Sequence, residues 1–406
     1  MSGRPRRHLT ASRGWLNDPH GITFHDGRYH AFYQANPLGT TWDRAIHWGH
    51  ATSTDLQTWH DEGVALAPAT DEVGCWTGCL VDDGDPVIYY TSVTDPDLNL
   101  GAIREARPLD ASWSTWAAGE RVVAAPVHED LRVFRDPAVR RTPDGWRMIV
   151  GAGYRDGRPA VLSFGSTDRR SWHYEGPLLM GAPDGSPDQP WLGAAWECPQ
   201  VLRVDGADVL LVGTWADEQT YEICAAVGTL DGHELRDVRW SELTKGEGHY
   251  APTVFTDREG HPTIMFWIRG VGSALDGWMG ALSIPYHIRV VDGSVRLTPH
   301  PAVAHTQPRD GADLAGWTWD ARVGDRLELV GGGRPASLQR TWRGVEVTAG
   351  KISVVLDVPV DQVDVVIDQG LVEVSTERQL TALALDPGVR LGAATGRLLA
   401  WPGEAS

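Results

Sequence analysis

Residues 26–33 read Asp-Gly-Arg-Tyr-His-Ala-Phe-Tyr, an acidic residue and a glycine followed at once by apolar and aromatic side chains. An Asp-Gly pair between two apolar runs is the strongest short-range signal for a β-hairpin. Acidic-Gly pairs of this kind recur at Asp83-Gly84, Asp144-Gly145, Asp205-Gly206 and Glu259-Gly260. Successive pairs lie 57, 61, 61 and 54 residues apart. This near-constant period predicts one β-rich unit per repeat.

A second motif repeats at about twice this interval. Residues 53–60 read Ser-Thr-Asp-Leu-Gln-Thr-Trp-His, and 113 residues later the segment 166–173 reads Ser-Thr-Asp-Arg-Arg-Ser-Trp-His. Helical periodicity is scarce along the whole chain. Five β-rich units predict a five-bladed β-propeller, because radial repetition leaves only short and protected sheet edges.

The composition changes near residue 300. Every Phe and Tyr lies at or before Tyr286, and later apolar residues are mostly Val, Leu and Ala. A Pro- and Gly-containing segment predicts a linker at 297–316. Short Val- and Leu-rich runs then predict antiparallel strands at 326–330, 344–348, 352–358, 363–367 and 371–374. We expect an all-β chain, with a five-bladed β-propeller over residues 1–296 and a small C-terminal β-sandwich over residues 317–406.

The charge of the chain argues against two classes of partner. Its 406 residues include 36 Lys and Arg against 54 Asp and Glu, a formal net charge of −18. Nucleic acid and anionic membrane surfaces repel a protein of this sign, so we expect neither as a partner. No apolar run approaches the roughly 18 residues of a membrane span. No apolar stretch follows the basic start of the chain either, so we expect no signal peptide and a cytoplasmic location.

Cysteine usage gives no indication of a metal or a disulfide framework. The chain has four cysteines, and Cys75-x-x-x-Cys79 lacks a matching second pair. This pattern argues against a zinc site. The sequence leaves open whether the protein is a monomer or a homo-oligomer.

Three acidic residues share one position in the repeat. Asp18, Asp136 and Glu197 each lie eight residues before the acidic residue of their own turn, where the other two repeats have Cys75 and Ala251. This position is on the strand that leads into the turn. If that strand is the innermost of its blade, all three acids face the central channel at one end.

Clustered acids need a chemical reason, because like charges repel one another. Cleavage of a glycosidic bond provides one, since one carboxylate must be ionised while the other holds a proton for the leaving oxygen. Crowding raises the pKa of one of the carboxyl groups, so that this group keeps its proton at near-neutral pH. The three acids in register therefore favour a catalytic site over ordinary turn formation.

Tryptophan is unusually common, with 19 Trp against 6 Phe and 9 Tyr. Tryptophan faces stack on the C–H surfaces of sugars. We expect about half of the tryptophans near the predicted inner strands to belong to the core. These tryptophans are Trp15, Trp42, Trp48, Trp76, Trp196 and Trp267.

Several motifs together resemble one family. They are Trp-Leu-Asn-Asp-Pro-His-Gly at 15–21, Tyr-Gln-Ala-Asn-Pro at 33–37, His-Trp-Gly-His-Ala at 47–51, Phe-Arg-Asp-Pro at 134–137, Trp-Glu-Cys-Pro at 196–199 and Tyr-Ala-Pro at 250–252. The chain resembles the β-fructofuranosidases of glycoside hydrolase family 32, the invertases and fructan hydrolases. The resemblance covers most of the chain and implies a propeller followed by a sandwich.

The resemblance also implies roles for single residues. Asp18 would be the nucleophile, Glu197 the general acid and base, and Asp136 the stabiliser of the transition state. The reaction would retain configuration, for which the two catalytic carboxyl groups lie about 5–5.5 Å apart. It would need no metal and no organic cofactor. The residues expected to bind the fructosyl unit are Asn17, Gln34, Trp42, Trp76, Thr77, Arg135, Cys198, Tyr250 and Trp267.

Four positions depart from the pattern of the resembled family. These are His20, Asp43, Thr77 and the pair Tyr286-His287, and we expect them to bear on the leaving-group side. The main expectation is hydrolysis of sucrose or short fructo-oligosaccharides. A fructosyltransferase with the same intermediate and a non-catalytic fructan-binding protein are the alternatives. A furanosidase acting on arabinose polymers is weaker, because residues 15–19 speak against it.

Overall fold

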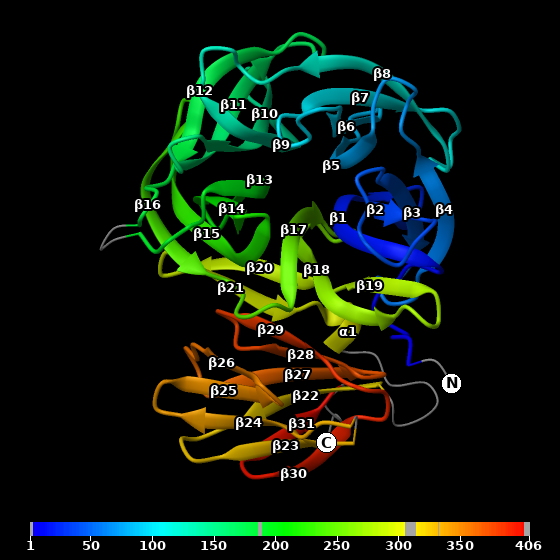
Figure 1. The fold of residues 1–406 in the computed structure, drawn as a ribbon. Helices are drawn as coiled ribbons and strands as arrows, with labels where there is room; N and C mark the ends of the chain where they lie inside the picture. The colour runs from blue at the N-terminus through cyan, green and yellow to red at the C-terminus, as the bar shows by residue number, and fades with distance from the viewer. Residues whose placement is uncertain (1–2, 186–188, 305–313, 332, 402–406) are drawn as a thin grey trace.

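The computed structural model describes residues 3–185, 189–304, 314–331 and 333–401 (Figure 1). Over these ranges the chain is almost entirely β-structure, with one short helix, α1 (Pro301–Ala304). No described helix has the length and apolarity needed to cross a membrane.

Each of the first four acidic-Gly turns belongs to a unit of four antiparallel strands. The first unit comprises β1 (Gly14–His25), β2 (Arg28–Asn36), β3 (His47–Ser53) and β4 (His60–Leu66). The second comprises β5 (Gly74–Val81), β6 (Val87–Val93), β7 (Ala102–Pro108) and β8 (Trp116–Val123). The third comprises β9 (Leu131–Thr142), β10 (Gly145–Tyr154), β11 (Pro159–Ser166) and β12 (His173–Met180). The fourth comprises β13 (Ala195–Val204), β14 (Ala207–Ala216), β15 (Gln219–Asp231) and β16 (Glu234–Glu242). In each unit the strands pair in sequence order.

The fifth repeat joins the first unit. It comprises β17 (His249–Thr256), β18 (Pro262–Ser273), β19 (Trp278–Leu282), β20 (Tyr286–Val291) and β21 (Ser294–Pro299). Strand β19 pairs in parallel with β1, so the two units form one nine-stranded sheet. The first strands β1, β5, β9, β13 and β17 contact one another in a closed ring. Figure 1 shows the sheets arranged around this centre, and four-stranded sheets in such an arrangement fit a β-propeller.

The predicted hairpins are confirmed. Asp26 and Gly27 have φ values of 47° and 80°, and Asp205 and Gly206 have 50° and 85°. Positive φ at both central residues is the type I′ geometry that matches the twist of the flanking strands, which explains the Asp-Gly preference. The second sequence motif also forms the same turn twice. In each copy the Asp carboxylate accepts backbone N–H groups two and three residues ahead, at Asp55 and at Asp168.

The C-terminal part forms two five-stranded sheets. One has the order β29-β28-β27-β22-β31 and the other β26-β25-β24-β23-β30. Their bounds are β22 (Leu314–Asp320), β23 (Arg326–Val330), β24 (Ala336–Thr341), β25 (Gly344–Ala349), β26 (Ile352–Leu356), β27 (Gln362–Asp368), β28 (Leu371–Ser375), β29 (Leu380–Ala384), β30 (Arg390–Ala394) and β31 (Arg397–Ala400). Both sheets contribute to one apolar core around Trp319, which is the packing of a sandwich. The predicted linker contains the ends of β21 and β22 and all of α1, while residues 305–313 lie outside the described ranges.

Candidate active site

A β-bulge interrupts the first strand of every unit at the level of the predicted site. The register shifts between Leu16 and Pro19 in β1, between Trp76 and Gly78 in β5, and between Glu197 and Gln200 in β13. Similar shifts occur in β9 and β17 beside Pro137 and Pro252. Proline has no N–H to donate to the ladder, so it is tolerated at a bulge. A bulge re-aims the neighbouring side chains, here at one end of the ring.

The positions of the bulges correct the prediction that all three acids share one position in the repeat. Asp136 itself has a positive φ of 65°, and the residues with positive φ on β13 and β17 are Cys198 and Ala251. Asp136 therefore corresponds to Cys198, and Glu197 stands one residue earlier than its repeat position suggests. The sequence count missed this offset because the number of residues between bulge and turn differs between the units.

The three acids lie at one cleft of about 360 Å³. Ligand pockets of proteins are typically about 300–1,000 Å³, so this volume is sufficient for a small sugar. Ten of the twelve predicted site residues line the cleft: Asn17, Asp18, Gln34, Trp42, Trp76, Arg135, Asp136, Glu197, Tyr250 and Trp267.

Asp18 on β1 is surrounded by hydrogen-bond donors. Thr77 Oγ1 donates to Asp18 Oδ2 over 2.7 Å, and Asn17 Nδ2 donates to Oδ1 over 2.9 Å. Gln34 Nε2 also reaches Oδ2, at 3.3 Å. Burial raises the pKa of Asp18 and the charge of Glu197 adds to this, whereas the bonds from Thr77 and Asn17 oppose it. The donors therefore favour the ionised carboxylate and fix its direction.

Asp136 on β9 is more deeply buried than Asp18. Its Oδ2 accepts the backbone N–H of Cys198 at 3.0 Å, and its own N–H donates to Thr91 Oγ1 at 2.8 Å. Burial and the charge of Glu197 raise the pKa of Asp136, while Arg135 acts in the opposite direction. Burial is therefore the main cause of the raised pKa of Asp136, and the neighbouring acid adds to it.

Glu197 on β13 has a partner on each carboxyl oxygen. Arg135 reaches Oε1 with Nη2 at 2.8 Å and Nε at 3.0 Å, and the Tyr250 hydroxyl donates to Oε2 at 2.6 Å. Burial raises the pKa of Tyr250 well above its ordinary value, so this hydroxyl stays protonated. A hydroxyl can donate to a carboxylate and accept from a carboxylic acid, so Tyr250 suits both protonation states of Glu197.

The tryptophans divide between the core and the cleft. Trp48 and Trp196 are fully buried in the core. The other four of the six predicted tryptophans line the cleft, and Trp42 is 46% exposed at its mouth. Trp42 meets Trp76 edge-on with ring centroids 5.4 Å apart, and Trp15 meets Trp267 edge-on at 5.7 Å. Two aromatic pairs therefore form walls beside the acids.

Thr77 and Cys198 do not line the cleft but lie beneath it. Thr77 contacts Asp18, and the Cys198 thiol lies 3.6 Å from Asp18 Oδ2 and 3.7 Å from Asp136 Oδ2. Burial raises the pKa of Cys198 well above its ordinary value, so it remains a thiol. These two residues contact the aspartates from beneath the cleft, and their part in binding the fructosyl unit stays a prediction.

Two departures from the resembled pattern lie away from the cleft. The His20 ring is buried against Trp48, with centroids 3.7 Å apart. Tyr286 donates to Glu373, and His287 bonds to Asp257. None of the three lines the cleft, so their effect on the leaving-group side stays a prediction. Asp43, in contrast, follows the lining residue Trp42 directly.

Four lining residues escaped the sequence reasoning: Asn99, Trp215, Glu218 and Thr220. They lie in the loop between β6 and β7 and in the hairpin of β14 and β15. None of the four lies on a first strand, where the repeated acidic position occurs. The equivalent connections at the same end of each unit were therefore overlooked, although the Asp217-Glu218 turn between two apolar strands was a usable signal.

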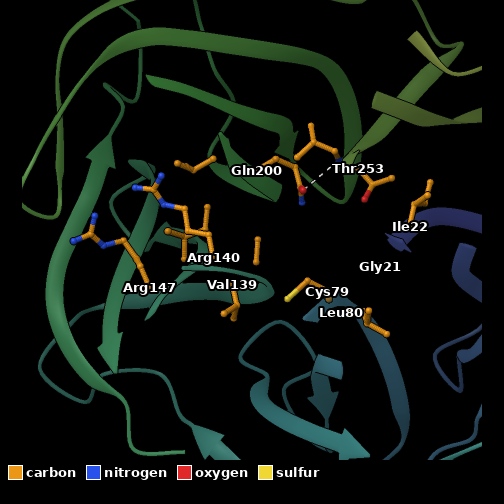
Figure 2. A pocket seen from close by; sticks show the side chains of 14 residues that line it. Gly21, Ile22, Cys79, Leu80, Val139, Arg140, Arg147, Gln200 and Thr253 are labelled. Atoms are coloured by element: carbon orange, nitrogen blue, oxygen red, sulfur yellow. Dashed lines mark hydrogen bonds between the residues drawn. The ribbon is translucent and has the colours of Figure 1, made fainter. Parts of the chain in front are cut away.

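The same five first strands also line a second cavity, of about 120 Å³ (Figure 2). Its lining residues lie further along each strand, toward the acidic-Gly turns; on β1 they are Gly21 and Ile22. Arg140 and Arg147 stand on one side of it, and no carboxylate is among its described lining residues. This cavity lacks the acid pair that glycoside cleavage needs.

Asp257, His287 and His300 bring potential metal ligands close together. Asp257 Oδ2 lies 3.0 Å from His287 Nε2 and 3.1 Å from His300 Nε2. The Ala302 N–H donates to His300 Nδ1, so the ring proton is on Nε2 and faces Asp257. Because a metal-binding nitrogen needs a free lone pair, this tautomer fits a hydrogen-bonded aspartate better than a metal site.

Comparison with known protein families gives one match over most of the chain. Residues 8–301 match the model described as the glycosyl hydrolases family 32 N-terminal domain. The chain is 30% identical over 313 residues to a sucrose-6-phosphate hydrolase of Escherichia coli and 32% identical over 316 residues to a raffinose invertase of Escherichia coli. Each alignment covers 73% of this chain and 64% of the relative, which is less than two thirds of the relative's length.

A similar fold occurs among solved structures. The Bombyx mori GH32 β-fructofuranosidase superposes with a TM-score of 0.82 at 22% identity, covering 98% of this chain and 93% of that chain. At this identity the likeness concerns the fold.

Proposed function

Because this chain belongs to glycoside hydrolase family 32, we propose that it is a retaining glycoside hydrolase that releases β-D-fructose from sucrose or short fructo-oligosaccharides. The observation that carries the proposal is the convergence of Asp18, Asp136 and Glu197, from three separate strands, on one cleft with aromatic walls. Relatives with the printed names sucrose-6-phosphate hydrolase and raffinose invertase support it.

In the first step Asp18 is the nucleophile and Glu197 the acid. An Asp18 carboxylate oxygen forms a bond to the anomeric carbon of fructose, while the bond from that carbon to the glycosidic oxygen breaks. Glu197 gives its proton to the departing oxygen, so the leaving sugar is neutral. The product on the enzyme is a fructosyl ester of Asp18.

In the second step Glu197 is the base. It takes a proton from water, whose oxygen attacks the anomeric carbon and breaks the ester, so that fructose leaves and both carboxyl groups return to their starting state. Asp136 binds fructose hydroxyls in this assignment and stabilises positive charge on the sugar. Arg135 and Tyr250 hold Glu197 from its two oxygens.

The remaining assignments follow from the same family reading. We propose five propeller blades over residues 1–296 and a sandwich over residues 317–406. The ring formed by the five first strands supports the blade count. We also propose a cytoplasmic enzyme with small carbohydrates as its ligands; the negative charge of the chain supports the absence of nucleic acid among its partners.

Product analysis tests the proposed activity. The purified protein is incubated with sucrose, 1-kestose, inulin and levan, and the products are separated by chromatography. Free fructose from sucrose or 1-kestose is the expected result. New oligosaccharides in excess of free fructose would assign a fructosyltransferase instead. A folded protein that binds fructan and cleaves none of the substrates would contradict the enzyme assignment.

A further inference from the structure

The charges that line the cleft are strongly unbalanced. Four lining residues are acidic, namely Asp18, Asp136, Glu197 and Glu218. Arg135 is the one lysine or arginine among the described lining residues, and both of its contacts with Glu197 are 3.0 Å or shorter. Its remaining nitrogen, Nη1, donates to Asn99 Oδ1 at 2.5 Å. The lining therefore offers a ligand no cation without an acidic partner.

The segments that carry Trp42 and Asn99 contain further acids. Asp43 follows the lining residue Trp42, and Asp95 and Asp97 lie in the loop that carries Asn99. The nearby Arg44 is bonded to Asp95 at 2.5 Å. Arg132 stacks 5.5 Å from the ring of Trp215, but its Nη2 lies 3.9 Å from Glu218 Oε1. Each of these cations at the mouth is thus accompanied by an acid.

Glu218 occupies its place at a conformational cost. It forms the two-residue turn between β14 and β15 with Asp217, and the two residues have φ values of 59° and 50°. Glycine or asparagine usually fills such positions, because a Cβ is disfavoured at positive φ. The chain nevertheless has an acid here, and its side chain is 68% exposed at the edge of the cleft.

We propose that Glu218 and the acidic mouth make this protein select uncharged fructosides and reject donors phosphorylated on the leaving sugar. This inference rests on the proposed function and deepens it. A phosphate ester carries nearly two negative charges at neutral pH and is bound in proteins by arginine or lysine forks. In this cleft such a group meets carboxylates, whereas a neutral sugar meets the ring of Trp42, which is 46% exposed at the mouth.

The test compares sucrose with sucrose 6-phosphate as substrates. We expect the wild-type kcat/KM to favour sucrose by at least about tenfold. In Glu218→Gln, which keeps the size of the side chain, the ratio should fall by about three- to tenfold, as one charge acts on a dianion through solvent. Glu120→Gln removes an exposed charge from the outer strand β8 and should leave the ratio unchanged.

Two results would overturn the inference. One is a wild-type kcat/KM for sucrose 6-phosphate that equals or exceeds the kcat/KM for sucrose. The other is a ratio of the two kcat/KM values that is the same in Glu218→Gln as in Glu120→Gln. If neither of these sugars nor 1-kestose is cleaved, the proposed function fails. Calorimetric binding of both sugars to Asp18→Asn then decides the inference separately: tighter binding of sucrose supports it, and equal or tighter binding of sucrose 6-phosphate contradicts it.

Discussion

At the scale of single residues, the site depends on how each carboxyl group is held. Asp18 has three side-chain donors, while Glu197 has an arginine on one oxygen and a tyrosine on the other. The two carboxyl groups are thus held by different partners, and the proposed mechanism gives them different roles. The repeat predicted the three acids because they lie on first strands. Gln34 lies on β2 instead, and only the family resemblance implied it as a site residue. The sequence could not distinguish Thr77 from a lining residue, because the depth of a side chain depends on packing.

Removing either catalytic acid should abolish most activity. We expect Asp18→Asn and Glu197→Gln each to lower kcat/KM for sucrose by about 10²-fold or more, because one acid–base group contributes about 10²–10⁴-fold. Steady-state kinetics gives the loss, and circular dichroism checks the fold, which relief of repulsion should preserve. Asp26→Asn is the matched control, since Asp26 is exposed in the turn of the same hairpin and asparagine tolerates its φ of 47°. Near-wild-type turnover in Asp18→Asn would refute the assignment.

Thr77 should set the acidic limit of activity. Its hydroxyl stabilises the ionised form of Asp18, so Thr77→Val should raise the pKa of Asp18. In the proposed mechanism Asp18 attacks only when it is ionised. The acidic limb of kcat/KM should therefore move to higher pH by about one unit, the value of one hydrogen bond to a charged group. Thr77→Ser, which keeps the hydroxyl, should leave the limb in place. An unmoved limb in Thr77→Val would show that this bond has no effect on Asp18.

At the scale of the elements, turns were more predictable than bulges. Asp26-Gly27 and Asp205-Gly206 specify their hairpins locally through positive φ, so the sequence disclosed them. The bulge that places Glu197 one residue before Cys198 depends on pairing with β14, which no local pattern contains. The β-runs at 326–330 and 363–367 were likewise found as β23 and within β27, because alternation marks a half-buried strand.

The turn between β17 and β18 should depend on one carboxylate. Asp257 Oδ1 accepts two backbone N–H groups of its own turn, and Oδ2 accepts from His287 on β20 and from His300 before α1. These bonds hold the pKa of Asp257 at about 2 despite its burial. Asp257→Asn loses the charge and places an amide against ring N–H groups. We expect a loss of about 2–3 kcal/mol in the free energy of unfolding, measured with urea.

Glu259 provides the control for that experiment. It lies in the same turn but is exposed, and we expect Glu259→Gln to change stability by less than about 0.5 kcal/mol. Equal stability of the two variants would show that the Asp257 cluster is not structural. Zinc added to the wild type should not raise its melting temperature, because the ring proton of His300 occupies the position that a metal would need.

At the scale of the whole molecule, a buried group of charges joins the start of the chain to the C-terminal sheets. His8 bonds to Asp368 through Nδ1 and to Glu373 through Nε2, both at 2.8 Å. Glu373 also accepts from His249 and Tyr286 in the last propeller unit. His8 and Glu373 are 365 residues apart, so no sequence pattern predicted the pair. Tyr286, a departure noted in the sequence, has its place in this cluster.

The cluster should make stability depend on pH in a defined window. The two carboxylates raise the pKa of His8 from 6.5 to about 9 against the effect of burial, so its contribution is complete below pH 6.5 and is lost as pH rises through 9. The histidines lower the pKa of Glu373 from 4.5 to about 2, so its contribution is complete above pH 4.5 and is lost as pH falls through 2. Both contributions are complete between pH 4.5 and 6.5.

Thermal unfolding as a function of pH measures this effect. The melting temperature of His8→Gln should lie furthest below that of the wild type near pH 6, and the difference should shrink toward pH 10 as His8 loses its proton. His128→Gln, at an exposed histidine, should follow the wild type throughout. A deficit in His8→Gln that is the same at pH 6 and pH 10 would mean that the charge of His8 does not stabilise the joint.

The covalent mechanism through Asp18 can be tested with one spectrum. The wild-type protein is incubated with sucrose in aqueous methanol, and the products are examined by NMR before they equilibrate. Methanol attacks the fructosyl ester of Asp18 from the face of the sugar that the leaving group had occupied. Methyl β-D-fructofuranoside should therefore form beside glucose. Formation of the methyl α-anomer would contradict the double displacement, and an absence of glucose would contradict the proposed activity altogether.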